Sequence, residues 1–286
     1  MKFINKKIIL ENQTQVIKRP IFNLEEIKNM YEGVIKSLDA ELKIPKDILK
    51  SFQIKDTLNP KIWENDTLKP EIRKQLLKIA VDFFTGLKLS SDIKLKDVLF
   101  VGSLANYNWS EFSDVDLHIV VDFADFKEDE DFIKKYFDAE KNLWNLKHDI
   151  KIKGFDVEIY VQELNEKLNS SAVYSVAKDK WLDKPEKTRF KLDKDVIKRR
   201  IQKLFHKLEN IKNDYEDKDY ESVIEKVTNL KDYIKKTRQS GLEKGGEFST
   251  ENILFKILRR TDFMEILDNY KNKAYDSDVA VNEEQP

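Results

Sequence analysis

The stretch that decides the fold is VGSLANYNWSEFSDVDLHIVVD, residues 101–122. A short apolar run at 97–101 ends at Gly102-Ser103, and residues 114–122 then alternate between apolar and polar side chains. Alternation with a period of two is typical of a β-strand with one buried face, so both segments are predicted strands. The alternation also places Asp114 and Asp116 on the same face of the second strand, with their carboxylates side by side.

A third strand is predicted at 152–162, interrupted near Gly154. Its alternating pattern carries Glu158 on the polar face, and Asp156 shares that face as a reserve candidate. An acid on a strand next to the Asp-x-Asp strand would bring three carboxylates together. The sequence therefore predicts an acidic cluster on one face of a small sheet.

Neighbouring carboxylates repel each other and raise each other's pKa unless a cation neutralises them. Mg²⁺ is commonly held by one or two carboxylates together with substrate phosphates. Three acids can hold two such ions about 3.5–4 Å apart around an in-line phosphoryl displacement. We therefore expect Asp114, Asp116 and Glu158 to bind two Mg²⁺ ions, with Mn²⁺ as a possible substitute, and to carry the catalysis.

Gly102-Ser103 fits the same chemistry. Glycine at the turn after a strand lets the backbone approach phosphate oxygens without a Cβ in the way. Ser103 offers a hydroxyl and an N–H at the start of the next short helix, where the helix dipole favours anions. The predicted reaction is transfer of a nucleotidyl group from a nucleoside triphosphate with release of pyrophosphate. The third acid would help to activate the acceptor hydroxyl as a general base.

These motifs resemble the DNA polymerase β superfamily of nucleotidyltransferases, which combines a Gly-Ser turn, a spacer, Asp-x-Asp and a later acid on a strand. Within that superfamily, the chain is most similar to uncharacterised nucleotidyltransferases of tailed bacteriophages, over most of residues 59–260. The segments that carry this likeness are 59–63, 102–110, 113–118, 156–160, 174–176 and 245–252. Glu158 departs from the superfamily pattern, which has Asp as the third acid.

The resemblance implies Mg²⁺ ligation by Asp114, Asp116 and Glu158, and triphosphate binding by Gly102 and Ser103. By analogy with related enzymes, a hydroxyl near 174–175 also meets the triphosphate, and Ser175 is the candidate. A helix N-cap or a packing role is the alternative for this segment.

The expected fold is α+β. A nucleotidyltransferase core, made of a small mixed sheet with flanking helices, is predicted at 65–190. Apolar residues at helical spacing predict a helical domain at 191–272. An N-terminal extension of helix and loop, residues 1–64, includes an amphipathic helix at 23–38. Residues 273–286 are polar and aperiodic, and we expect them to be disordered.

Composition excludes several other classes of protein. The 286 residues are 40% hydrophobic, too rich for intrinsic disorder, and contain no cysteine, which excludes disulfides, thiolate metal sites and a cysteine nucleophile. No run approaches eighteen apolar residues, so we expect a cytoplasmic protein without a membrane partner. The resemblance implies the cytoplasm of a phage host. The net charge is only −1, although residues 191–213 and 226–244 are locally basic.

Several alternatives stay open at this level. The acceptor could be an RNA 3′ end, a protein or a small molecule, because the basic segments permit RNA without requiring it. A catalytically inactive nucleotide- or RNA-binding module of the same fold is the rival function. His118 could orient a ligand or be a hydrogen-bonded structural histidine. Tyr107 and Trp109 could stack on a base or anchor their loop.

Overall fold

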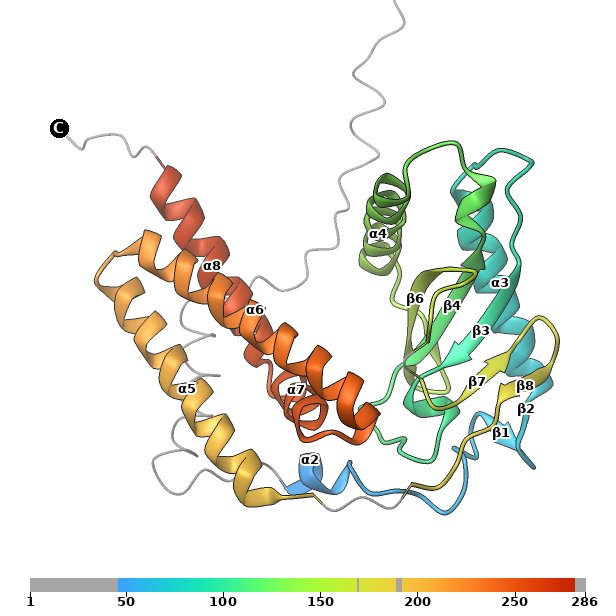
Figure 1. Ribbon diagram of the computed structural model, residues 1–286, viewed down its shortest axis with the longest axis horizontal. Coiled ribbons are helices and arrows are strands. Elements are labelled where there is room, and N and C mark those ends of the chain that lie inside the picture. The colour runs from blue at the N-terminus through green and yellow to red at the C-terminus, as the bar shows by residue number, and fades with distance from the viewer. Residues whose placement is uncertain (1–45, 169, 189–191, 281–286) are drawn as a thin grey trace, which may run out of the picture. The chain divides into compact units, whose positions relative to one another are not determined.

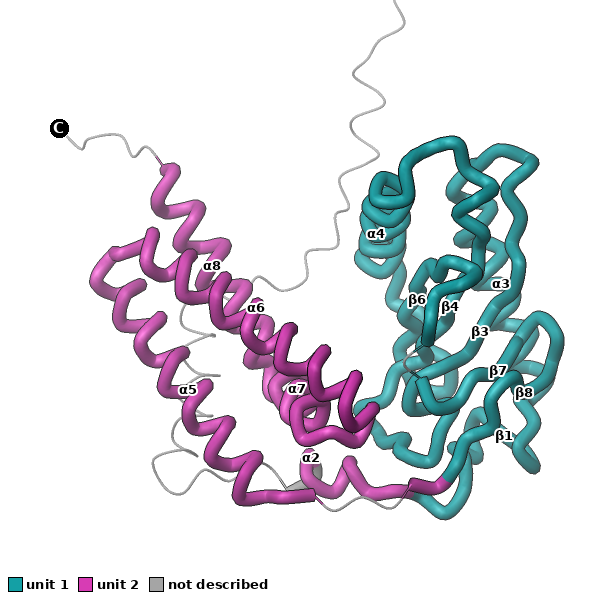
Figure 2. The backbone as a smooth tube through the Cα atoms, in the orientation of Figure 1, with its two compact units in different colours: residues 1–21, 55–186 teal, residues 22–54, 187–286 magenta. Residues whose placement is uncertain are grey.

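The computed structural model describes residues 46–168, 170–188 and 192–280 (Figure 1). These residues form two compact units (Figure 2). Unit 1 contains residues 55–186, and unit 2 contains residues 46–54 and those from 187 onwards. The helix predicted at 23–38 lies outside the described residues.

Unit 1 is built on a mixed, six-stranded sheet. Its strands, in spatial order, are β5 (Lys151–Ile152), β6 (Phe155–Glu163), β4 (Val115–Val121), β3 (Asp97–Val101), β7 (Val173–Ser175) and β8 (Lys180–Asp183). β4 and β6 are parallel, and all other neighbouring strands are antiparallel. The mixed α+β fold and the three predicted strands are thus confirmed. The interruption near Gly154 is a turn between β5 and β6 in which Lys153 and Gly154 both have positive φ.

Two helices flank this sheet, α3 (Pro70–Gly86) and α4 (Glu130–Lys147). Pro70 suits the first turn of α3 because it lacks an N–H, and the Asp129 carboxylate caps α4 by accepting from the Asp131 N–H at 2.9 Å. One core joins the apolar faces of α3, α4 and β4, with Leu76, Phe83, Ile133, Phe137, Leu117 and Ile119 among its members. The polar positions of β4 therefore lie on the other face of the sheet.

The β1–β2 hairpin (Trp63–Glu64 and Thr67–Leu68) belongs to unit 1, and its Trp63 and Leu68 are part of the core of that unit. Trp63 stacks on Phe100 with ring centroids 5.5 Å apart and on Trp181 at 4.7 Å. Its Nε1–H donates to the Leu104 carbonyl oxygen at 2.7 Å. Residues 55–64 thus belong to the sheet-containing unit, because Trp63 is buried there, and the expected boundary at 64/65 shifts to 54/55.

Unit 2 is helical, as predicted. It contains α2 (Lys46–Lys50), α5 (Lys194–Glu216), α6 (Tyr220–Gly245), α7 (Thr250–Arg260) and α8 (Phe263–Val279). Asp193, Asp219 and Ser249 cap α5, α6 and α7 with their side-chain oxygens. A separate apolar core joins these helices.

The predicted disorder of residues 273–286 is wrong for its first half. Residues 273–279 continue α8, which ends at Val279. Ala274 and Tyr270, one helical turn apart, are both buried in the core of unit 2. This packing stabilises a helix in a segment whose polar, aperiodic sequence predicts disorder. Residues 281–286 lie outside the described residues.

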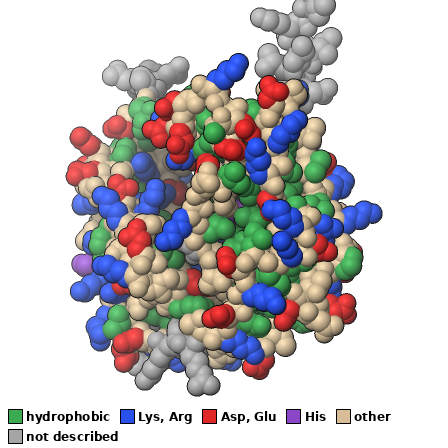
Figure 3. Space-filling view, turned by 45° about the vertical axis from the view of Figure 1, so that its right-hand side comes forward, with side chains coloured by type: hydrophobic (Ala, Val, Ile, Leu, Met, Phe, Trp, Pro, Cys, Tyr) green, Lys and Arg blue, Asp and Glu red, His purple; other side chains and the backbone are tan. Residues whose placement is uncertain are grey.

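The described helices include none that combines the length and apolarity needed to cross a membrane. On the face shown in Figure 3, acidic and basic side chains are intermixed with hydrophobic ones. This agrees with the small net charge of the chain, −1.

Candidate metal centre

Strand register brings the predicted acids together. In the parallel pair of β4 and β6, Asp116 lies opposite Glu158, and in the antiparallel pair of β3 and β4 it lies opposite Val101. Asp114 comes immediately before β4, two residues from Asp116 and so on the same side. The three acids therefore meet at one edge of the sheet, where β3 ends and where β4 and β6 begin.

The cluster is tight. Asp114, Asp116 and Glu158 each offer one carboxylate oxygen, and these oxygens all lie within 4.8 Å of one another. Asp114 and Asp116 are half-buried and Glu158 is exposed, so the cluster is open to solvent on one side. Three negative groups at this spacing repel each other in the absence of a cation, and carboxylate oxygens are the ligands that Mg²⁺ and Mn²⁺ prefer. The residues present fit a divalent metal centre.

The reserve candidate, Asp156, forms an ion pair away from the other acids. Its carboxylate is paired with Lys151, across the β5–β6 turn, and its side chain is 62% exposed. The carboxylate group of Asp156 is thus not part of the acidic cluster.

Gly102 is adapted to the carboxylate beside it. Its φ is +77°, in the left-handed region that other residues rarely adopt, and a Cβ at this position would lie 1.8 Å from Oδ2 of Asp116. We expected the glycine to make room for phosphate. The structure shows that it makes room for the second acid of Asp-x-Asp.

Ser103 begins a short 3₁₀-helix, η1 (Ser103–Ala105), directly after Gly102. Its Oγ lies 2.7 Å from Oγ of Ser113, and the Ser113 hydroxyl also accepts the Ser110 N–H at 3.0 Å. These contacts tie the Gly-Ser turn to the residue just before Asp114. Sequence analysis missed Ser110 and Ser113, although Ser-x-x-Ser before Asp-x-Asp is visible in the sequence.

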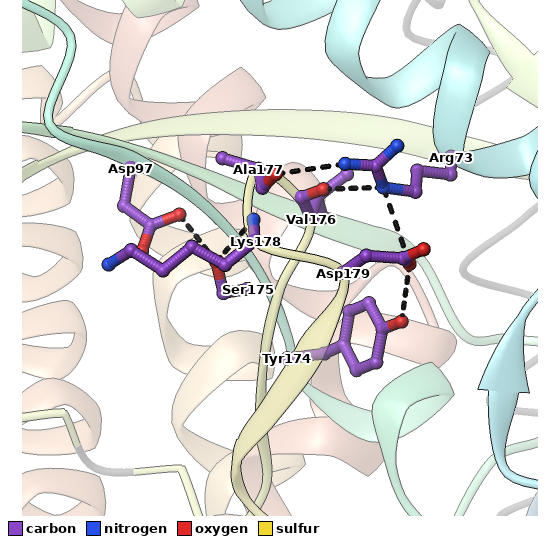
Figure 4. A network of polar contacts seen from close by, with 8 residues as sticks. All are labelled: Arg73, Asp97, Tyr174, Ser175, Val176, Ala177, Lys178 and Asp179. Atoms are coloured by element: carbon purple, nitrogen blue, oxygen red, sulfur yellow. Dashed lines mark hydrogen bonds and ion pairs between the residues drawn. The ribbon is translucent and has the colours of Figure 1, made fainter.

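Ser175 is not brought to the acidic cluster. Its side chain is fully buried, donates to Oδ1 of Asp97 at 2.7 Å and accepts the Lys178 N–H at 3.0 Å (Figure 4). Asp97 begins β3, whereas the acids meet at the other end of that strand. The physical reason is register: Ser175 lies opposite Leu99, and the residues before Val173 lie nearest the Gly102 end.

The segment before β7 does reach the Gly-Ser turn. The Asn106 side-chain amide, just after η1, donates to Oγ of Ser171 at 2.7 Å. Ser171, four residues before Ser175, is therefore the hydroxyl of this segment that lies against the residue following η1. The pair Ser170-Ser171 was the available signal.

Tyr174 has a packing role. Its ring is buried against Trp63 and Trp181, with centroids 5.1 and 5.0 Å away. Its hydroxyl donates to Oδ1 of Asp179 at 2.7 Å, and Asp179 also pairs with Arg73 at 3.3 Å (Figure 4). Burial and the Asp179 carboxylate raise the pKa of Tyr174 to about 12. This network holds the β7–β8 turn.

His118 lies on the polar face of β4, next to Tyr160 of β6. Its Nδ1 is 2.8 Å from Oε1 of Gln162, and burial lowers the pKa of His118 below its usual value. The hydrogen-bonded arrangement, one of the two alternatives for this residue, is thus the observed one.

The loop between the turn and the acids is anchored to an earlier segment. Trp109 Nε1–H donates to the Thr57 carbonyl oxygen at 2.9 Å, and the Lys55 N–H donates to the carbonyl oxygen of Tyr107 at 2.7 Å. Lys55 Nζ also lies 5.3 Å from the Trp109 ring centroid. Of the two alternatives for Tyr107 and Trp109, these contacts match loop anchoring.

Comparison of the chain with protein-family models, with curated proteins and with solved structures finds no match. The acidic cluster, by its residues and its geometry, is therefore the feature of the chain that indicates a function.

Proposed function

We propose that this protein is a Mg²⁺-dependent nucleotidyltransferase. The observation that carries the proposal is the meeting of Asp114, Asp116 and Glu158, within 4.8 Å, beside a Gly-Ser turn at the end of β3. Carboxylate oxygens gathered next to a backbone turn suit divalent metal ions and a phosphorylated substrate.

The reaction would proceed by in-line displacement at the α-phosphorus of a nucleoside triphosphate. The acceptor hydroxyl oxygen forms a bond to that phosphorus, and the bond to the bridging oxygen breaks, so that pyrophosphate leaves. Divalent ions, when bound, would supply charge neutralisation for the phosphates and the developing negative charge. Asp114, Asp116 and Glu158 would hold the ions, and Glu158, the most exposed of the three, would receive the proton of the acceptor hydroxyl.

Gly102 and Ser103 would bind the triphosphate through their backbone at the start of η1. Because the Ser103 hydroxyl is already bonded to Ser113, its contribution would be to hold the turn as well as to contact phosphate. The acceptor could be an RNA 3′ end, a protein or a small molecule, and the acidic cluster itself does not select among them.

The test is incubation of the full chain with each α-³²P-labelled nucleoside triphosphate, Mg²⁺, and RNA, host lysate or small-molecule hydroxyl acceptors. Label on an acceptor, stoichiometric pyrophosphate, and loss of both in Asp116→Asn support the proposal. Asp156→Asn is the matched control, because it removes an acid of the same face that lies outside the cluster. Nucleotide binding without pyrophosphate release under any acceptor would instead support a binding module that lacks turnover.

A further inference from the structure

Two basic segments that are separate in sequence lie together in unit 2. α5 and α6 run antiparallel: Asp214 near the end of α5 pairs with Lys226 near the start of α6. Lys207 Nζ lies 5.1 Å from the ring centroid of Tyr233, which belongs to the middle of α6 (Figure 1). Because the helices are antiparallel, the first half of α5 and the second half of α6 lie toward the same end of the pair.

This arrangement separates charge along the helix pair. Residues 194–207 contain six Lys and Arg against one acid, and residues 233–245 contain four against one. At the other end, residues 208–216 and 220–232 together contain three Lys against six acids. The pair thus has one basic and one acidic end, although the net charge of the whole chain is −1.

The basic end of the helix pair carries exposed Lys and Arg side chains. Arg199, Lys203 and Lys236 are exposed, and none of them makes an ion pair with a residue that the structure describes. In the same unit, by contrast, Lys226 and Lys231 are paired with Asp214 and Asp268.

An aromatic ring lies among these cations. Tyr233 is 55% exposed and is contacted by Lys207, which lies one helical turn after Lys203. We call Arg199, Lys203, Lys207, Tyr233 and Lys236 the basic ridge. Its α5 part, Arg199 to Lys207, spans about 12 Å, or roughly two helical turns.

We propose that the basic ridge binds single-stranded nucleic acid. Exposed Lys and Arg bind successive phosphates and release counterions, and an exposed aromatic ring offers a stacking surface for a base of any sequence. Arg199, Lys203 and Lys236 would contact phosphates, and a base would stack on the face of Tyr233 opposite Lys207. An acidic protein segment would use the same charges but has no need of the exposed ring. This binding does not depend on the proposed transferase activity.

The experiment measures fluorescence anisotropy of a labelled 15-nucleotide oligouridine RNA titrated with the full chain, without nucleotide or divalent metal, between 50 and 300 mM NaCl. The variant Arg199→Gln/Lys203→Gln/Lys236→Gln should bind at least about 10-fold more weakly at 100 mM NaCl. Its slope of log K against log salt should be shallower by about 2, since each lost phosphate contact on a single strand removes roughly 0.7. Lys74→Gln/Lys135→Gln/Lys218→Gln removes the same charge from three exposed lysines elsewhere and should bind RNA like the wild type.

Substitutions of Tyr233 distinguish the binding of nucleic acid from the binding of an acidic polypeptide. Tyr233→Ala should weaken RNA binding by about 5- to 100-fold, whereas Tyr233→Phe, which keeps the ring, should retain it. Circular dichroism checks that each variant is folded. Equal weakening by the two triple variants would overturn the proposal. The proposal would also be overturned if Tyr233→Ala bound RNA with wild-type affinity and polyglutamate competed for the labelled RNA as strongly as unlabelled RNA does. Asp116→Asn should bind RNA with wild-type affinity. The RNA-binding proposal can therefore be tested even if the transferase proposal fails.

Discussion

Gly102 and Asp116 approach so closely that a Cβ on Gly102 would lie 1.8 Å from Oδ2 of Asp116. The two residues are fourteen positions apart in the chain, and the antiparallel register of β3 and β4 brings them together because Val101 lies opposite Asp116. The parallel register of β4 and β6 then sets Glu158 beside the same aspartate. The place of one carboxylate in the cluster thus depends on the absence of a side chain at the turn.

Gly102→Ala should therefore lower the transferase activity by about 100-fold or more, because its methyl group displaces the Asp116 carboxylate, and displacement of a positioned group costs roughly that much. The control is Gly154→Ala. Gly154 also has a positive φ, +91°, but no atom lies within 4 Å of its would-be Cβ. Both variants should lose about 1 kcal/mol of stability from backbone strain, and only the first should lose activity. Equal activity in the two variants would show that the Gly102–Asp116 approach is not needed.

The acidic cluster should make the stability of unit 1 depend on metal. Mg²⁺ or Mn²⁺ at 100 times its dissociation constant should stabilise the folded state by about 2.7 kcal/mol, since the unfolded chain has no such site. Differential scanning calorimetry with and without metal measures this gain. In Asp116→Asn the gain should be largely lost, whereas Asp156→Asn should keep it because Asp156 is paired with Lys151. Metal-independent melting of the wild type would argue against a divalent site.

Ser103 and Ser175, both predicted from the sequence to bind the triphosphate, should differ in their effects when substituted. Ser175→Ala should destabilise the protein by about 1–3 kcal/mol, because it leaves the buried Asp97 carboxylate without the hydroxyl that donates to it at 2.7 Å. Its activity per folded molecule should be unchanged. Ser103→Ala should instead reduce activity, since it breaks the link to Ser113 next to the acids. Urea unfolding combined with the transfer assay distinguishes the two, and a selective loss of activity in Ser175→Ala would contradict the structural role.

Alkaline pH should destabilise unit 2 through Tyr270. Burial raises the pKa of Tyr270 to about 12, with a further contribution from Glu216. The unfolded chain ionises this phenol near pH 10, so its contribution to stability is complete below pH 10 and is lost as pH rises from about 10 to about 12. The slope is about 1.4 kcal/mol per pH unit for one group.

Urea unfolding followed by helical circular dichroism at pH 9 to 11 measures this dependence. Tyr270→Phe should make the decline with pH less steep. Tyr275→Phe is the matched control, because Tyr275 belongs to the same helix and is 57% exposed. If Tyr275→Phe flattened the curve as much as Tyr270→Phe, burial of Tyr270 would not be the cause.

Much of the architecture follows from local patterns. The alternation in 114–122 predicts both the strand and the shared face of Asp114 and Asp116, because side-chain direction within a strand depends only on the backbone. Ser249 as a helix cap is predictable for a similar reason, since the cap and the N–H that it accepts are three residues apart. The disorder expected for 273–279 fails because burial of Ala274 in unit 2 outweighs the local composition.

The position of Ser175 could not be predicted, because its neighbours depend on which residue of β3 it faces. A strand shifted by two residues would present the same sequence pattern and place a different hydroxyl near the turn. The hydrogen bond between Ser103 and Ser113 and the anchoring of Trp109 on Thr57 are long-range contacts of the same kind.

The amino-acid sequence by itself determined which segments are strands and helices, which side chains share a face, and that three acids were candidates for one cluster. Only the tertiary structure decided that Asp116 faces both Glu158 and Gly102, that Ser175 is buried against Asp97, and that two basic segments form one ridge. The reason is that periodicity along a chain is a local property. Strand register and helix pairing are instead set by packing between residues far apart in the sequence, and that packing decides which side chains meet.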